Sequence, residues 1–439
     1  MTERTIALFG LGYVGTVSGA CLAARGHRVI GVDLDRGKVD GITAGRSPVI
    51  EEGVEDLVRR GVASGRLEAT MDGAAAVRSA DLSLVCVGTP SRANGGLDTG
   101  HVEQVTREIG AALAGRTDYH VVVYRSTMLP GTVETRLIPI LAQTSGRAPG
   151  ADLGVAVNPE FLREGTSVRD FHEPSRTVIG AIDSRAGDLV QPLYEGIPGP
   201  VVRTDLKTAE MVKYADNCFH ALKVAFGNEI GNICKSAGID SHELMDIFCL
   251  DRKLNLSPVY LKSGYAFGGS CLPKDLRAIV QHAREHDLRT PLLEAIIASN
   301  EAQKRLGLQM ILRTRKMKVG ILGLSFKPGT DDLRESPAVE LAETLIGKGF
   351  DVAIYDRNVS LARIMGANRA YIEREIPHIA GLMRASLDEL RDHAEVLVVT
   401  SGDPEYAAFL PTLRPDQAVI DLVRLGAAAT PAAYEGICW

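Results

Sequence analysis

The segment 268–275, with the sequence GGSCLPKD, brings a thiol, an amine and a carboxylate close together along the chain. Pro273 suits the first turn of a helix, so the segment predicts a helix that begins beside Cys271. The positive end of that helix and the ammonium group of Lys274 would both favour the thiolate form of Cys271. The segment therefore predicts a nucleophilic cysteine, because a cysteine that only fills a core needs neither the two glycines nor the Lys274-Asp275 pair.

The chain has seven cysteines, an odd number, and no C-x-x-C pair. This indicates reduced thiols in a cytosol-like compartment rather than a disulfide framework. An isolated cysteine is most often buried and inert. That is the expectation for the six others, which are Cys21, Cys86, Cys218, Cys234, Cys249 and Cys438.

Four polar residues, Lys213, Asn217, His220 and Asn228, recur along the long helical pattern in the middle of the chain. At about 100° per residue they fall near 0°, 40°, −20° and 60°, which is one narrow stripe. Apolar side chains flank the stripe, which favours a ligand-binding face over a solvated one. For His220 alone, a hydrogen-bonded structural histidine is an equally good interpretation.

The segment 158–165, with the sequence NPEFLREG, carries two carboxylates, Glu160 and Glu164. They would share one face if the segment were helical, because they stand at positions i and i+4. Two carboxylates held close together can have divided pKa values, which suits general acid and base work. Ordinary surface carboxylates are the alternative.

The segment 10–15, with the sequence GLGYVG, follows a predicted strand and opens a predicted helix, the context in which G-x-G-x-x-G indicates a dinucleotide site. Gly10 would permit the tight turn, Gly12 the approach of a pyrophosphate, and Gly15 the close packing of helix and strand. Asp33 ends the next predicted strand and would bind the ribose, which favours NAD over NADP, although Arg36 weakens that preference. Glycines that merely shape a turn are the alternative.

Thr89 and Thr127 follow later predicted strands, at the sheet edge where ligands bind in α/β folds. They are candidate cofactor contacts, with a turn-capping role as the alternative for each. A related loop at 320–325, with the sequence GILGLS, has Ser325 where the second glycine of the fingerprint is expected. This pattern indicates a nucleotide-type fold without an intact dinucleotide loop, which could bind another nucleotide.

These residues must be positioned by strands and helices in alternation. Short, continuously apolar runs are typical of parallel strands covered on both faces, and the helical intervals between them predict βαβ units. The fold class is therefore α/β, with two Rossmann-like doubly wound lobes joined by a central all-helical region that contains one long helix. The predicted strands are 5–9, 28–32, 82–87, 120–124, 153–157, 318–322, 351–355, 396–399 and 418–422, and the predicted central helices are 205–238, 241–248, 274–286 and 291–312. We expect three domains, at 1–203, 204–315 and 316–439, and the long exposed helices suggest a dimer interface.

Composition narrows the class of protein. Lys and Arg number 49 against 55 Asp and Glu, a net charge of −6, so the chain lacks the basic field of a nucleic-acid binder. No apolar run reaches the roughly 18 residues of a membrane span, and no signal-peptide cleavage pattern follows the first strand. We expect a soluble cytoplasmic protein without a metal site.

The predicted cofactor and thiol together suggest a particular reaction. Oxidation of an alcohol by NAD needs a base but no thiol. A thiol becomes useful when the aldehyde is oxidised again, since its addition restores a carbon that bears a hydride and the second oxidation leaves a thioester for water to hydrolyse. A two-electron hydroxyacid dehydrogenase would leave Cys271 and the second lobe unused, and a non-enzymatic NAD-sensing protein would leave the whole set of reactive residues unexplained.

Five ordered motifs, GGSCLPKD, RSTMLPGT, NPEFLREG, EMVKYADN and SFKPGTDDLRESP, make the chain resemble the UDP-glucose/GDP-mannose 6-dehydrogenases over essentially its whole length. HALKVAFGNEIGN, DRKLNLS and EGICW are most similar to the GDP-mannose 6-dehydrogenases of the alginate pathway. The resemblance implies a four-electron oxidation of a nucleotide sugar, GDP-mannose in first place, to the uronate with two NAD. UDP-glucose, oxidised by the same mechanism, is the alternative substrate. The chain departs from the GDP-mannose enzymes at one sugar or phosphate contact, where it has Val259-Tyr260 in place of an aromatic pair.

The resemblance also implies residue roles and an intertwined homodimer through the central helix, with higher oligomers in some members. Cys271 would be the nucleophile, Lys213, Asn217 and Asp275 would assist the oxidations, and Glu164 would act in hydrolysis with Glu160 and Thr127. The NAD contacts would be Tyr13, Val14, Asp33, Lys38, Thr89, Thr127, Lys274 and Arg334. The nucleotide-sugar contacts would be Glu164, Lys213, Asn217, His220, Asn228, Tyr260, Lys262, Tyr265 and Lys327, with the second lobe binding the nucleotide.

Overall fold

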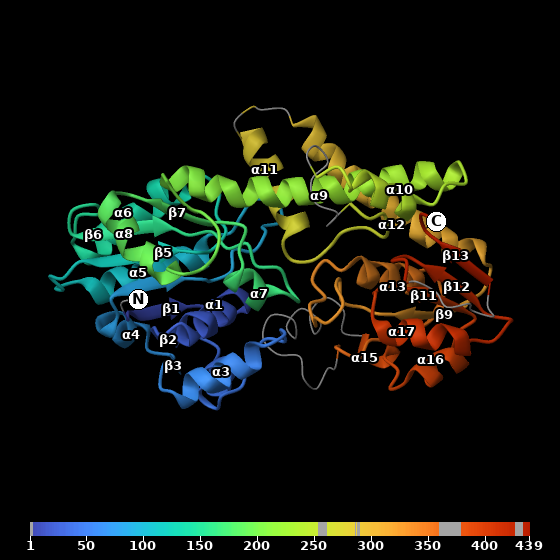
Figure 1. The fold of residues 1–439 in the computed structure, drawn as a ribbon, viewed down its shortest axis with the longest axis horizontal. Helices are drawn as coiled ribbons and strands as arrows, with labels where there is room; N and C mark the ends of the chain where they lie inside the picture. The colour runs from blue at the N-terminus through green and yellow to red at the C-terminus, as the bar shows by residue number, and fades with distance from the viewer. Residues whose placement is uncertain (1–2, 253–260, 286, 288–289, 360–378, 426–432) are drawn as a thin grey trace. The chain divides into compact units, whose positions relative to one another are not determined.

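The computed structural model describes residues 3–252, 261–285, 287, 290–359, 379–425 and 433–439. Tyr260, one of the expected substrate contacts, lies outside these residues. The chain divides into two compact units, Met1–Asp216 and Asn217–Trp439, each built around one sheet (Figure 1).

The sheet of the first unit has eight strands in the order β3-β2-β1-β4-β5-β6-β7-β8, and its pairs are parallel except for β6 with β7. The bounds are β1 Thr5–Phe9, β2 Arg28–Val32, β3 Leu67–Thr70, β4 Leu82–Val85, β5 His120–Tyr124, β6 Leu153–Val157, β7 Thr177–Ala181 and β8 Val201–Thr204. Four predicted strands are confirmed with their bounds, and β4 ends two residues before the predicted 87. The prediction missed β3, β7 and β8; β3 and β8 are edge strands whose side chains are partly exposed, so neither is continuously apolar.

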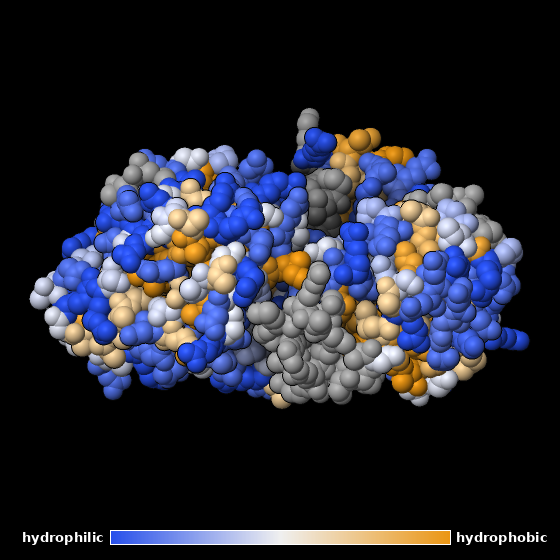
Figure 2. All heavy atoms as spheres, turned by 90° about the horizontal axis from the view of Figure 1, so that it is seen from below, coloured by the Kyte–Doolittle hydropathy of each residue, from blue (hydrophilic) through white to orange (hydrophobic). Residues whose placement is uncertain are grey.

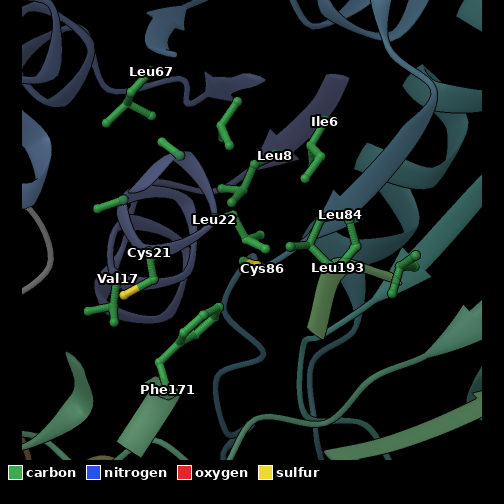
Figure 3. Close-up of a cluster of buried hydrophobic side chains, with 14 of the residues drawn as sticks. Ile6, Leu8, Val17, Cys21, Leu22, Leu67, Leu84, Cys86, Phe171 and Leu193 are labelled. Carbon is green, nitrogen blue, oxygen red and sulfur yellow. The ribbon is translucent and has the colours of Figure 1, made fainter. Parts of the chain in front are cut away.

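Helices cover both faces of this sheet (Figure 1). In β1, Ile6 and Leu8 pack into one core cluster while Ala7 and Phe9 pack into the other, because successive side chains of a strand point to opposite faces. Figure 3 shows the first cluster, in which α1 packs against the strands. The helix bounds are α1 Tyr13–Ala24, α2 Arg36–Thr43, α3 Val54–Ala63, α4 Gly73–Ser79, α5 Gly100–Leu113, α6 Ile138–Ser145, α7 Ser167–His172 and α8 Ser184–Val190.

The predicted central helices are confirmed, with ends that differ by one or two residues. They are α9 Leu206–Ser236, α10 Ser241–Phe248, α11 Leu272–Glu285 and α12 Pro291–Arg313. The helix α9 begins in the first unit and continues into the second. Across the residues that the structure describes, no helix combines the length and apolar character needed to cross a membrane.

The second unit has a parallel five-stranded sheet in the order β10-β9-β11-β12-β13. Its elements are β9 Lys318–Leu322, β10 Asp351–Tyr355, β11 Val396–Val399, β12 Ala418–Asp421, β13 Ala433–Gly436, α13 Pro337–Gly347, α15 Ile379–Leu382, α16 Leu387–His393 and α17 Pro404–Phe409. The first four strands are confirmed, β12 being one residue shorter, and the partly exposed edge strand β13 was missed. On the face seen in Figure 2, most of the coloured side chains are hydrophilic, with groups of apolar ones between them. The predicted α/β class with two doubly wound sheets and a helical region is thus confirmed.

Candidate active site

Two of the three glycines in the loop 10–15, Gly10 and Gly15, have a steric reason to be glycine. Gly10 has a φ of +94°, and a Cβ atom there would lie 3.0 Å from the backbone nitrogen of Val87. A Cβ on Gly15 would lie 1.8 Å from the carbonyl oxygen of Gly10, so only glycine lets α1 approach the loop. A Cβ on Gly12 would meet nothing within 4 Å, which leaves open space in front of the first backbone N–H groups of α1. The loop therefore fits a pyrophosphate held at a helix N-terminus.

Asp33, directly after β2, forms a hydrogen bond to the glycine loop. Its Oδ2 accepts hydrogen bonds from the backbone N–H of Leu11 at 2.7 Å and from Nζ of Lys38 at 3.2 Å. Its Oδ1 accepts from the backbone N–H of Asp35 at 2.9 Å. A carboxylate at this position, beside the glycine loop, suits a ribose with a free 2′-hydroxyl and repels a 2′-phosphate.

The other expected cofactor contacts of the first unit lie at the ends of the strands and at the start of α1. The Thr89 hydroxyl is buried and donates to the backbone oxygen of Thr127 at 2.8 Å, so these two residues meet at the carboxyl ends of β4 and β5. Val14 is partly buried against the core cluster behind the loop. The Tyr13 hydroxyl donates to the carboxylate of Glu51.

Glu160 forms a buried ion pair with Lys213 of α9, with Oε1 and Nζ 2.8 Å apart. Burial alone would raise the pKa of the Glu160 carboxyl, but the Lys213 ammonium and the nearby Arg125 guanidinium hold that pKa below its usual range. Residues 158–163 form no helix, and Gly165 turns the chain with a φ of +84°. The two carboxylates consequently do not share a helix face, and Glu160 is paired with an ammonium group instead; Glu164 is half-buried in the turn.

In the second unit, Cys271 lies at the N-terminus of α11, as its sequence predicted. Its backbone oxygen accepts from the N–H of Asp275 at 2.9 Å, which closes the first turn of the helix. Its Sγ lies 3.8 Å from the hydroxyl of Ser270 and is exposed, whereas the six other cysteines are buried. Burial raises the thiol pKa to about 12 at Cys21, Cys86 and Cys218 and to about 11 at Cys438. Cys21 and Cys86 lie in the apolar cluster of Figure 3.

The two glycines before Cys271 let its loop dock against the segment that precedes α13. A Cβ on Gly268 would lie 2.3 Å from the backbone oxygen of Glu335 and 2.4 Å from Cδ of Pro337. Gly269 has a φ of +86°, and a Cβ there would lie 2.8 Å from the ring of Phe326. Close packing therefore requires glycine at both positions, and the positive φ is a second reason at Gly269.

The carboxylate of Asp275, in the first turn of α11, is almost fully buried at 1% exposure. Its Oδ2 accepts a hydrogen bond from the side-chain amide of Asn217 on α9. Its Oδ1 lies 3.1 Å from Nζ of Lys274. The structure thus brings two expected site residues, Asn217 and Lys274, to the carboxylate of a third, Asp275, one helical turn after Cys271.

Several expected substrate and cofactor contacts of the second unit bind other parts of the protein. The buried amide of Asn228 accepts from the N–H of Gly264 at 2.8 Å and donates to the backbone oxygen of Tyr265 at 3.1 Å. The ammonium of Lys262 lies 2.6 Å from Oδ1 of Asp246, in an exposed ion pair. Burial raises the pKa of the Tyr265 phenol. Arg334 donates from Nε to Oδ1 of Asp332 at 2.8 Å, while His220 and Lys327 are half-buried.

The loop after β9 has the same turn as the glycine loop 10–15, but no helix begins directly after it. Gly323 has a φ of +94°, and the N–H of Leu324 donates to Oδ2 of Asp356 at 2.8 Å. The Ser325 hydroxyl also donates to that oxygen at 3.2 Å, and the next helix begins only at Pro337. No helix N-terminus therefore follows this turn directly, which agrees with the predicted loss of the dinucleotide fingerprint.

The sequence reasoning missed three carboxylates that hold the site segments. Glu210 on α9 accepts from the N–H groups of Gly131 and Val133, at 2.6 and 3.0 Å. It stands three positions before Lys213, so the buried stripe could have included it. Glu51 and Glu335 gave no local signal, because their partners are remote in the sequence. Among the described residues, no group of three or more His, Cys, Asp or Glu side chains is placed to hold a metal ion.

Models of the UDP-glucose/GDP-mannose dehydrogenase family match the chain in three parts. The NAD binding domain matches residues 4–198, the central domain 207–302 and the UDP binding domain 320–425. The chain is 51% identical over 436 residues to GDP-mannose 6-dehydrogenase of Pseudomonas putida, which covers 99% of this chain and 100% of that protein.

Two solved structures are also similar to this one. A UDP-glucose dehydrogenase from the archaeon Pyrobaculum islandicum has a TM-score of 0.90 and 34% identity, over 100% of this chain and 98% of that chain. A ternary complex of GDP-mannose dehydrogenase from Pseudomonas aeruginosa has a TM-score of 0.58 and 49% identity, over 99% of this chain and 100% of that chain.

Proposed function

The chain belongs to the UDP-glucose/GDP-mannose dehydrogenase family, and from that premise we propose that it oxidises GDP-mannose to GDP-mannuronate with two NAD and one water. The observation that carries the proposal is the exposed thiol of Cys271 at the start of α11, in a chain whose other cysteines are buried. An alcohol dehydrogenase that stops at the aldehyde has no use for such a thiol.

The glycine loop and Asp33 would hold NAD, which would supply the hydride acceptor for the sugar C6 in each oxidation. In the first oxidation the alcohol also loses its hydroxyl proton and becomes an aldehyde. The Cys271 thiolate then forms a C–S bond to the aldehyde carbon, whose oxygen takes up a proton. Removal of the second hydride and of that proton leaves a thioester on Cys271. Water then forms the new C–O bond, the C–S bond breaks, and the carboxylate leaves.

The other site residues have roles that follow from their surroundings. The Lys213 ammonium is buried and paired with Glu160, and its positive charge stabilises an oxygen that develops negative charge. Asn217 and Asp275 are held together by their hydrogen bond and assist proton transfer at the reacting oxygen. Glu164 activates the water for thioester hydrolysis, supported by Glu160 and Thr127.

The substrate contacts are assigned by the family resemblance, and this part of the proposal leaves a second candidate substrate. His220, Asn228, Tyr260, Lys262, Tyr265 and Lys327 contact the nucleotide sugar, and Lys274 and Arg334 reach the cofactor. UDP-glucose, oxidised by the same chemistry, is the second candidate, because the family model that matches residues 320–425 is described as a UDP binding domain.

Turnover of the purified enzyme with GDP-mannose and with UDP-glucose, in separate reactions, tests this proposal. We expect two NADH per molecule of GDP-mannose and little reduction with UDP-glucose. One NADH per sugar would remove the thioester mechanism, and faster turnover of UDP-glucose would replace the substrate. NAD binding without turnover of either sugar, unchanged by Cys271→Ala, would indicate a non-enzymatic NAD sensor.

The proposal includes three domains, at 1–203, 204–315 and 316–439, and a homodimer formed through the central helices in the cytoplasm. Exposed apolar side chains support the dimer: Phe219 and Phe226 on α9 are 43% and 41% exposed, and Ile247 on α10 is 63% exposed. The odd number of cysteines, none of them in a C-x-x-C pair, supports a cytoplasmic location. Sedimentation velocity of the purified chain and of Phe219→Glu tests the dimer, which the charged side chain should weaken.

A further inference from the structure

Glu51, just before α3, is a buried carboxylate, 8% exposed, to which the family resemblance gives no role. Its Oε2 accepts a hydrogen bond from the Tyr13 hydroxyl and another, at 2.7 Å, from the N–H of Gly165. Its Oε1 accepts from the N–H of Ser167 at 2.9 Å. A buried carboxylate must be compensated by donors of this kind, and hydrogen bonds to a charged acceptor are roughly twice as strong as neutral ones.

These donors come from two loops that are remote from each other in the sequence. Tyr13 is the first residue of α1 and lies within the glycine loop 10–15 that fits the cofactor. Gly165 and Ser167 belong to the turn that leads into α7. Glu51 therefore fastens the start of the cofactor helix to that turn, through contacts that all lie within the first unit.

The turn also carries Glu164, and it is held on both sides of that residue. On one side, Asp170 accepts from the backbone N–H of Arg163 at 2.9 Å and from its guanidinium at 3.0 and 2.7 Å. On the other side, the backbone N–H of Gly165 donates to Glu51. The Tyr13 hydroxyl lies 3.5 Å from the backbone oxygen of Arg163, the residue before Glu164. Burial raises the pKa of the Tyr13 phenol, and the negative charges of Glu51 and Glu164 raise it further.

We propose that Glu51 is a positioning residue that sets Tyr13 toward the cofactor and Glu164 toward the water of thioester hydrolysis. The second half of this inference rests on the proposed function of Glu164. In that step water forms a C–O bond to the acyl carbon, its proton passes to Glu164, and the C–S bond breaks to release the Cys271 thiolate. Loss of Glu51 then weakens NAD binding and, separately, lets the thioester accumulate.

The decisive variant is Glu51→Gln, which keeps the shape of the side chain but has one acceptor oxygen instead of two. The NH2 group of the new amide replaces one carboxylate oxygen. It must therefore face at least one of the three groups that donate to Glu51 now, and that hydrogen bond is lost. Glu52→Gln is the matched control, because Glu52 is the next residue and is exposed. Tyr13→Phe removes the phenol hydroxyl alone.

We expect Glu51→Gln to raise the Kd for NAD roughly tenfold in a fluorescence titration without substrate, with Glu52→Gln unchanged. In an acid quench during turnover, intact-mass spectrometry should show more acylated Cys271 for Glu51→Gln than for wild type or Tyr13→Phe. In the double variant, the effects of Glu51→Gln and Tyr13→Phe on NAD affinity should be less than additive, because both remove the same hydrogen bond.

Equal NAD affinity and equal acylation for Glu51→Gln and Glu52→Gln would overturn the inference. So would a loss of binding and turnover that only follows the unfolded fraction in a thermal melt, since that would make Glu51 a structural residue. The NAD titration is independent of the chemistry. If the wild type yields one NADH per sugar, the proposed function fails, while the titration still decides whether Glu51 sets the cofactor loop.

Discussion

The ammonium nitrogen of Lys213 lies 2.8 Å from Oε1 of Glu160, and each side chain is only 8% exposed. This ion pair joins α9 to the end of β6, two elements that carry proposed reactive groups. Breaking such a pair by removing one partner leaves an uncompensated buried charge, whereas an exposed pair can be broken at little cost.

Glu160→Gln should therefore destabilise the protein at pH 7 by about 3–5 kcal/mol, because the Lys213 ammonium stays buried without its counter-ion. Urea unfolding followed by circular dichroism measures the change. Glu134→Gln is the control, since Glu134 pairs with Lys207 in an exposed ion pair and its loss should change little. Equal effects of the two substitutions would contradict the buried-pair interpretation.

The same pair predicts how the stability depends on pH. The pKa of Glu160 lies below its ordinary value of 4.5 in the folded protein, so this carboxylate contributes stability above that value and loses it as the pH falls through the lowered pKa. The difference in unfolding free energy between wild type and Glu160→Gln should accordingly shrink when the pH is lowered from 7 toward 3. A difference that stays constant over this range would show that the charge of Glu160 is not responsible.

Cys271→Ser should abolish uronate formation and leave the Kd for NAD within about twofold of wild type, because a serine hydroxyl is a far weaker nucleophile than a thiolate. Product analysis by chromatography and an NAD titration give the two readouts. Cys249→Ala, at a buried cysteine whose pKa is raised by burial, should retain activity. Equal loss of activity and NAD binding in Cys271→Ser would point to a structural role for the thiol.

Asp33→Ala should weaken NAD binding and reduce the preference for NAD over NADP, because it removes both the ribose acceptor and the charge that repels a 2′-phosphate. Ratios of kcat/KM for the two cofactors measure this preference. Asp356→Ala is a matched control, since Asp356 accepts from Leu324 in the second unit just as Asp33 accepts from Leu11 in the first. Unchanged selectivity in Asp33→Ala would remove the ribose assignment.

Arg277 of α11 donates to both carboxylate oxygens of Glu335, at 2.8 and 2.6 Å, beside the loop that carries Cys271. Arg277→Gln should slow the alkylation of Cys271 by iodoacetamide and lower kcat several-fold with little change in the melting temperature, because the loop loses an anchor. The exchanged pair Arg277→Glu with Glu335→Arg should recover part of the rate. Full activity in Arg277→Gln would show that the glycine packing alone positions the thiol.

Much of the fold could be predicted from the sequence because its signals are local. Parallel strands buried on both faces are continuously apolar, so β1, β2, β5 and β6 were found with their bounds. The edge strands β8 and β13 were missed, because an edge strand is partly exposed and loses that pattern. The site residues show the same difference between features set by local sequence and features set by tertiary packing.

The sequence by itself determined the residues whose chemistry depends on near neighbours: the glycine loop with its acid Asp33, and Cys271 at the start of a helix. Only the tertiary structure decided which remote groups meet. It paired Glu160 with Lys213 instead of Glu164, placed Glu51 between two loops, and required Gly268 and Gly269 for contact with a distant segment. The physical reason is that turns and helix ends are set within a few residues, whereas buried charges take whichever partners the packing of the sheets and helices brings within reach.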